Sequence, residues 1–234
     1  AHHLTAVHQP GTTLPTRLEY DALENVIKMT NSNGHATLYE RDALNRVSKV
    51  IFPGGTSESF SYDNNSNLKS WNRGTYTVAY TYDNLDRLEQ ISSPTTNDNI
   101  VFGFDDLDRV QSMTDNSGTT TYAYTNNYLL DHVIHPGNKK IQFRYDQGDR
   151  LFQTIDPENL STDYTFSDRN ELNSVTHDSQ TVRYQHDLVG RATVTEYPNG
   201  IKTERTYSER NQLLYKNYAK GSSPLITLKY AFNQ

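Results

Sequence analysis

The sequence predicts an all-β fold of about ten β-hairpins in tandem, paired edge to edge into a long curved antiparallel sheet. Three observations predict it. A Tyr-Asp motif, sometimes relaxed, recurs about every 21 residues over most of the chain. Apolar residues stand at constant offsets from that motif, and polar turn formers separate them. No segment shows a capped helical period.

The first residue of each motif is called the anchor here and numbered position 0. Position −2 is apolar or aromatic in every repeat except the one with Arg205. Side chains alternate along a strand, so positions −2 and 0 lie on one face, as in Tyr80-Thr81-Tyr82. Small or β-branched residues between them favour a strand. The anchors are Tyr20, Arg41, Tyr62, Tyr82, Phe104, Tyr124, Tyr145, Phe166, His186, Tyr207 and Tyr230.

A second strand is predicted from position +6 onward. Position +6 is apolar in every complete repeat, and position +9 is apolar in most. Leu88 and Ile91 are an example. The step between them is odd, which breaks strict alternation, and a β-bulge or a change of face is expected there.

Two turns divide each repeat. The first spans positions +1 to +5, as in Asp83–Arg87, and the second closes the repeat, as in Tyr197–Gly200. Asp and Asn side chains stabilise such turns by accepting hydrogen bonds from nearby backbone N–H groups. Each repeat therefore consists of strand, turn, strand and turn.

The domain organisation follows from the period. Residues 1–17 are interpreted as the tail of a preceding repeat, with Pro10-Gly11-Thr12 as its turn. Residues 18–234 are tandem repeats, the last of them truncated, with no room for a separate second domain. The chain is thus expected to be a fragment of a longer array. His2-His3 is not interpreted as a metal site.

Strand geometry constrains such an array. About twenty strands spaced about 4.8 Å apart would extend about 96 Å. Open sheets of more than about ten strands rarely stay flat, and accumulated twist favours curling. An open or spiral ribbon, quasi-one-dimensional like a solenoid, is expected. Its packed surface would be the stripe of side chains at positions −2, 0, +6 and +9.

Two segments carry a family resemblance. Tyr80–Leu88, which reads YTYDNLDRL, resembles the YD repeat of the Rhs family, and Phe143–Leu151 matches it as closely. The resemblance covers essentially the whole chain in about ten consecutive repeats. The family includes bacterial Rhs and wall-associated toxins, insecticidal toxin complexes and the animal teneurins. Membership implies a β-ribbon that forms a hollow shell around a toxin-like domain in a secreted or cell-surface protein.

The motif contains the candidate site residues. Asp occupies position +1 in seven of ten complete repeats, and Arg occupies position +5 in five, always together with the Asp. A ligand-binding ladder of charges is one interpretation. A turn-capping Asp paired with Arg is the other, and repetition favours this structural role. The structural motif residues are Tyr20, Asp21, Tyr62, Asp63, Tyr82, Asp83, Arg87, Phe104, Asp105, Arg109, Tyr145, Asp146, Arg150, Asp187 and Arg191.

The sequence contains no recognisable motif for catalysis or metal binding. The chain has no cysteine, no Gly-x-Ser-x-Gly, no His-Glu-x-x-His and no phosphate-binding glycine loop. Asp63–Asn67 resembles the start of a calcium loop, but Leu68 follows where that loop requires glycine. Asp156-Pro157 resembles part of the self-cleaving segment of Rhs shells but lacks its glycine. We expect no enzyme activity, no cofactor and no bound metal.

Composition limits the partners. The net charge of −6 opposes binding to a phosphate backbone, and no apolar run is long enough to span a membrane. The 11% aromatic content is too high for a disordered chain. The expected function is that of a structural shell segment around a neighbouring domain or toxin cargo. The alternative is an extracellular module that binds carbohydrate through its aromatic stripe. Self-association through strand edges or the aromatic face is also expected.

Overall fold

The computed structural model describes residues 4–8, 11, 14–93 and 96–232. His2-His3 and, apart from Gly11, the turn expected at residues 10–12 lie outside these residues. Strands and turns make up the described residues, which include no helix. Among them no helix is long and apolar enough to span a bilayer. The all-β prediction is confirmed. The chain forms two compact units, residues 1–119 and 120–234.

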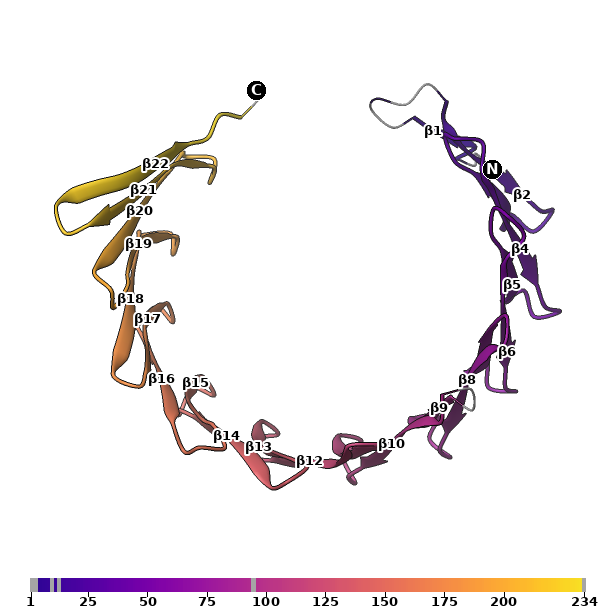
Figure 1. Cartoon of the computed structure of the whole chain (residues 1–234), viewed down its shortest axis with the longest axis horizontal. Helices are drawn as coiled ribbons and strands as arrows, with labels where there is room; N and C mark the ends of the chain where they lie inside the picture. Colours follow the sequence, from indigo (N-terminus) through magenta and orange to yellow (C-terminus); the bar gives the residue numbers. More distant parts are fainter. Residues whose placement is uncertain (1–3, 9–10, 12–13, 94–95, 233–234) are drawn as a thin grey trace. The chain divides into compact units, whose positions relative to one another are not determined.

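The first unit is a meander in which consecutive strands pair antiparallel (Figure 1). Its strands are β1 (Ala6–Val7), β2 (Thr16–Tyr20), β3 (Val26–Thr30), β4 (Ala36–Arg41), β5 (Val47–Ile51), β6 (Ser57–Tyr62), β7 (Leu68–Arg73), β8 (Tyr76–Tyr82), β9 (Leu88–Ser93), β10 (Asp98–Phe104), β11 (Val110–Asp115) and the start of β12 (Gly118–Tyr124).

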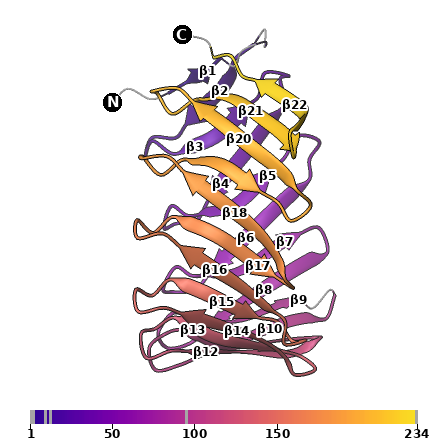
Figure 2. The same ribbon diagram turned by 90° about the vertical axis from the view of Figure 1, so that its left-hand side faces the viewer.

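The second unit has the same construction. Figure 2 shows its strands β16 to β22 side by side, with turns along both edges. All its strand pairings are antiparallel. Its strands after β12 are β13 (Leu130–His135), β14 (Lys139–Tyr145), β15 (Leu151–Ile155), β16 (Ser161–Phe166), β17 (Leu172–His177), β18 (Gln180–His186), β19 (Ala192–Glu196), β20 (Ile201–Tyr207), β21 (Leu213–Lys220) and β22 (Ser223–Lys229).

A β-bulge at position +7 explains the odd apolar spacing. In the β8–β9 hairpin, Tyr82 lies opposite Leu88 and Tyr80 opposite Ile91, while Glu89 has no opposite residue. Positions 0, +6, −2 and +9 therefore share one face. The bulge that the sequence predicted, as one of two possibilities, is confirmed. The same shift precedes the anchors Tyr20, Arg41, Tyr62, Phe104, Tyr124, Tyr145, Phe166, His186 and Tyr207.

Each unit packs through a thin apolar stripe rather than a thick core. Among the described residues, Val78 and Val133 are the buried hydrophobic side chains, and both are still 7–9% exposed. The residues at positions −2, 0, +6 and +9 are mostly half-buried. A single layer of hairpins buries side chains mainly against the neighbouring hairpin, so stability depends on contacts between adjacent repeats.

Candidate functional site

The turns at positions +1 to +5, called motif turns here, share one backbone geometry. In the turn after β8, the Asp83 N–H donates to the Arg87 carbonyl at 3.0 Å, and the Asp86 N–H donates back to the Asp83 carbonyl at 3.0 Å. The residue at position +4 has a positive φ in all ten motif turns, from Asp149 at 59° to Gly190 at 83°. A type I turn followed by a left-handed residue is a standard hairpin connection, and it accounts for Asn, Asp, Ser or Gly in eight of the ten turns. Glu24 and Tyr128 take the same conformation in the other two.

The Asp at position +1 holds the motif turn in place. The Oδ1 of Asp83 accepts hydrogen bonds from the N–H groups of Leu85 at 2.8 Å and Arg87 at 3.0 Å. Asp21, Asp42, Asp63, Asp105, Asp146 and Asp187 accept from the same two positions of their own turns. Three repeats lack the Asp, and there a hydroxyl takes its place, at Thr125, Ser167 and Ser208.

The Arg at position +5 pairs with the Asp of its own turn. The Arg87 Nε donates to the Asp83 Oδ2 at 2.7 Å, and its Nη2 lies 2.6 Å from the same oxygen. Arg46, Arg109, Arg150 and Arg191 make the equivalent Nε bond at 2.6–2.8 Å. In the five repeats that have both residues, the structure thus brings the Asp and the Arg together as a turn-bracing pair.

The same Arg also contacts the next hairpin. The guanidinium of Arg87 lies 4.5 Å from the centroid of the Phe104 ring, and its Nη1 donates to Asp108 at 2.5 Å. Phe104 and Asp108 are positions 0 and +4 of the following repeat. Arg46, Arg150 and Arg191 likewise stack on Tyr62, Phe166 and Tyr207 and donate to Ser66, Asn170 and Asn211.

Anchor tyrosines add a bond in the opposite direction. The Tyr82 hydroxyl donates to the Leu68 carbonyl at 3.1 Å, and Leu68 is position +6 of the preceding repeat. Tyr62, Tyr145 and Tyr207 donate to Val47, Leu130 and Ala192 in the same way. Burial raises the pKa of Tyr82 and Tyr145, which is consistent with protonated hydroxyls that donate these bonds.

The contacts between repeats are not visible in the sequence pattern. The motif predicted a pair of Asp and Arg inside one turn, but the Arg also reaches a ring and a turn of the next repeat. The run of Asn, Asp, Ser and Gly at position +4 was a usable signal for the left-handed residue. Among the described residues, no group of His, Asp and Glu could hold a metal ion.

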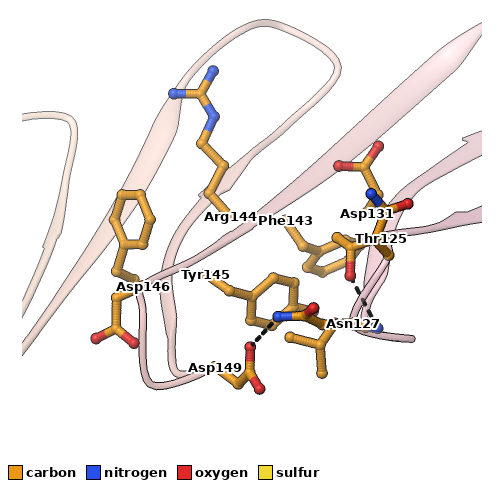
Figure 3. A pocket seen from close by; sticks show the side chains of 11 residues that line it. Thr125, Asn127, Asp131, Phe143, Arg144, Tyr145, Asp146 and Asp149 are labelled. Carbon is orange, nitrogen blue, oxygen red and sulfur yellow. Dashed lines mark hydrogen bonds between the residues drawn. The ribbon is translucent and has the colours of Figure 1, made fainter.

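Two open clefts lie between neighbouring motif turns. The larger has a volume of about 450 Å³ and lies over Phe143 and Tyr145, between the turns that begin at Thr125 and Asp146 (Figure 3). The other, about 420 Å³, lies in the equivalent place over Tyr80 and Tyr82. In both cases the earlier turn has no Arg at position +5, where Leu129 and Asn67 stand instead.

Acid should destabilise the protein through the Asp–Arg pairs. Hydrogen bonds from the paired Arg side chains lower the pKa of Asp42, Asp83, Asp105 and Asp146. A carboxylate whose pKa is lower in the folded state stabilises that state above its unfolded pKa, about 3.9, and the stabilisation is lost as pH falls through the folded pKa. Above about pH 5 these carboxylates stay ionised, so they should cause no change in the urea midpoint of unfolding. Below about pH 4 the midpoint should fall. The Asp83→Asn variant should show a shallower fall, and an unchanged midpoint from pH 7 to pH 2.5 would contradict this account.

The chain is similar in fold to several solved toxin-complex structures. No curated protein sequence matches the chain. Among solved structures, the Tc holotoxin pore of Photorhabdus luminescens is 14% identical with a TM-score of 0.55, over 90% of this chain and 14% of that one. Two structures of TcdB2-TccC3 complexes, one with Cdc42 and one with TEV, are 12% and 14% identical with TM-scores of 0.57 and 0.59. They match 95% of this chain and 16% and 12% of theirs, and the likeness is one of fold.

The sequence shows the family of the chain as well as its fold. Residues 16–232 match the teneurin YD-shell family, a span that holds every motif turn described above. The Arg and the anchor ring of the motif also join one hairpin to the next, and a repeat array is held together by such contacts between neighbours. The chain therefore belongs to the teneurin YD-shell family and is a structural shell element.

Proposed function

We propose that this chain is a non-enzymatic segment of a shell that encloses or displays a neighbouring, toxin-like domain of a large secreted or cell-surface bacterial protein. The proposal combines family membership with the contacts that the motif turns make between neighbouring hairpins. The neighbouring domain, or cargo held by the shell, is the expected partner. Neither a cofactor nor a nucleic acid takes part.

The observation that carries the proposal is the double link between hairpins. An Arg stacks forward on the next anchor ring, and an anchor Tyr donates back to the preceding repeat. The forward link is made by Arg46, Arg87, Arg150 and Arg191, and the backward link by Tyr62, Tyr82, Tyr145 and Tyr207. Both links meet at Tyr62 and at Tyr207, and each braces one hairpin against its neighbour. A site for catalysis would not need to recur in this way.

Protease protection tests the shell function. In the parent protein, the neighbouring domain should resist added protease while the repeats are folded. Destabilising the repeats with Leu88→Ala should expose that domain to cleavage at a lower protease concentration. Leu85→Ala is the matched control, because Leu85 is 66% exposed at the tip of a motif turn. Equal cleavage of the neighbouring domain with and without the Leu88→Ala substitution would contradict enclosure.

Carbohydrate binding is the second candidate function, favoured by the half-exposed aromatic stripe. Aromatic faces such as those of Tyr80 and Tyr122 present apolar surface to sugar rings. A glycan array with the folded chain tests it. A saccharide bound at micromolar affinity, and lost on Tyr80→Ala, would favour this function over a purely structural one.

The 234-residue chain itself should associate in solution. Strand β22 is exposed along its length, and Leu225, Ile226 and Leu228 are 41–57% exposed. Exposed apolar strands recruit other strands, and charged side chains suppress this. We expect the mass measured by light scattering to rise with concentration, and less so after Ile226→Lys. A constant monomer mass at high concentration for the unsubstituted 234-residue chain would contradict the prediction.

A further inference from the structure

We propose that the cleft over Tyr145 binds the guanidinium group of an arginine side chain supplied by another polypeptide. This binding would be independent of the proposed shell function. In four other repeats, an arginine of the chain itself fills the equivalent space.

Four internal arginines show how a guanidinium occupies the space between two motif turns. Their guanidinium carbons lie 4.4–5.2 Å from the ring centroid of the next anchor. Each also donates to the side chain at position +4 of the next repeat, at 2.5–3.1 Å. This binding site for a guanidinium, called the seat here, therefore has two parts, an aromatic face and a hydrogen-bond acceptor. The arginines are Arg46, Arg87, Arg150 and Arg191.

The cleft over Tyr145 has the same two parts without the arginine. Its ring is the anchor Tyr145, and its acceptor at position +4 is the carboxylate of Asp149. Asp149 corresponds to Asp108, which accepts the 2.5 Å bond from Arg87. The position that would supply the arginine is Leu129, whose side chain has no donor and leaves about 450 Å³ open.

The charges around this cleft favour a cation. Asp149 accepts a hydrogen bond from the Asn127 amide at 3.1 Å, and an amide does not neutralise a carboxylate. Asp131, on the wall of the cleft, is 49% exposed and pairs with His132 at 2.6 Å. Asp146 is already balanced by Arg150. Arg144 donates to Gln153 at 2.9 Å and points away from the Tyr145 ring (Figure 3).

The cleft over Tyr82 is a poorer seat for the same ligand. There Asp86 accepts two amides, from Asn65 at 2.7 Å and Asn67 at 2.9 Å. Lys69 lines that cleft as Arg144 lines the cleft over Tyr145, so the lining cations do not distinguish the two. Asp149, which accepts one amide where Asp86 accepts two, is the acceptor more open to an added guanidinium.

A guanidinium fits this seat better than an ammonium. It is planar, it stacks on aromatic faces, and it presents several donors at fixed angles. An ammonium is a compact and more strongly hydrated charge. An arginine held in a polypeptide also has neighbouring residues that can extend along the open cleft.

The test is a titration with N-acetyl-L-arginine amide, followed by NMR at the Tyr145 ring and the Asn127 side-chain amide. We expect saturable shifts at millimolar probe. N-acetyl-L-glutamine amide, which is uncharged, should bind about tenfold more weakly. Two outcomes would overturn the proposal: no saturable shift with the arginine probe, or equal binding of the glutamine probe.

Variants of the cleft sharpen the test. Leu129→Arg should fill the seat internally, raise the melting temperature and abolish the shifts, whereas Leu129→Met should retain them. Asp149→Asn keeps the shape of the cleft and should weaken binding by about tenfold. Unchanged binding of the arginine probe in both folded Leu129→Arg and Asp149→Asn would assign the shifts to another surface and overturn the proposal.

Discussion

The variants Tyr82→Ala and Leu88→Ala should each lower the free energy of unfolding by about 2–5 kcal/mol, toward the lower end because both side chains are half-buried. Tyr82 and Leu88 lie directly opposite each other across the β8–β9 hairpin. Tyr82→Ala also removes the hydroxyl bond to the Leu68 carbonyl. Chemical denaturation of each variant is the measurement.

Two controls separate the ring from its hydroxyl and the stripe from the turn. Tyr82→Phe keeps the ring and should cost about 1 kcal/mol, the usual contribution of one hydrogen bond. Leu85→Ala truncates an exposed side chain and should change stability by less than about 0.5 kcal/mol. Near-zero losses for both Tyr82→Ala and Leu88→Ala would mean that the stripe contributes no packing.

Gly190→Val should destabilise the second unit by about 1–3 kcal/mol, the range for a residue forced into a sparsely populated backbone conformation. Gly190 has a φ of 83° at position +4 of its motif turn. An added Cβ would lie 3.5 Å from the Glu171 Oε1, so crowding is not the cause. The cost would come from a β-branched side chain in the left-handed region.

Gly190→Asn is the matched control for that prediction. Asn occupies position +4 in three other motif turns, at Asn45, Asn170 and Asn211, with φ of 61–67°. It should therefore be tolerated with little change in the urea midpoint. Equal midpoints for Gly190→Val and Gly190→Asn would contradict the strain argument.

The β-bulge is a feature whose position, but not whose type, could be predicted from the sequence. The odd step between Leu88 and Ile91 predicted an irregularity at that point, and the structure has Glu89 bulged there. The pattern left a change of face open as the alternative. Backbone register resolves the choice, because the bulge returns positions +6 and +9 to the same face as positions −2 and 0.

The sequence by itself determined the all-β class, the repeated hairpin and the Asp–Arg pair in the five turns that have both residues. These features depend on residues a few positions apart, so their spacing is visible in the chain. Only the tertiary structure decided that Arg87 stacks on Phe104 and that Tyr82 reaches Leu68, because these partners lie 14–17 residues away in sequence. The same holds for the open seat over Tyr145. Its existence depends on a side chain missing from one repeat and a ring present in the next, and strand pairing is what brings the two together.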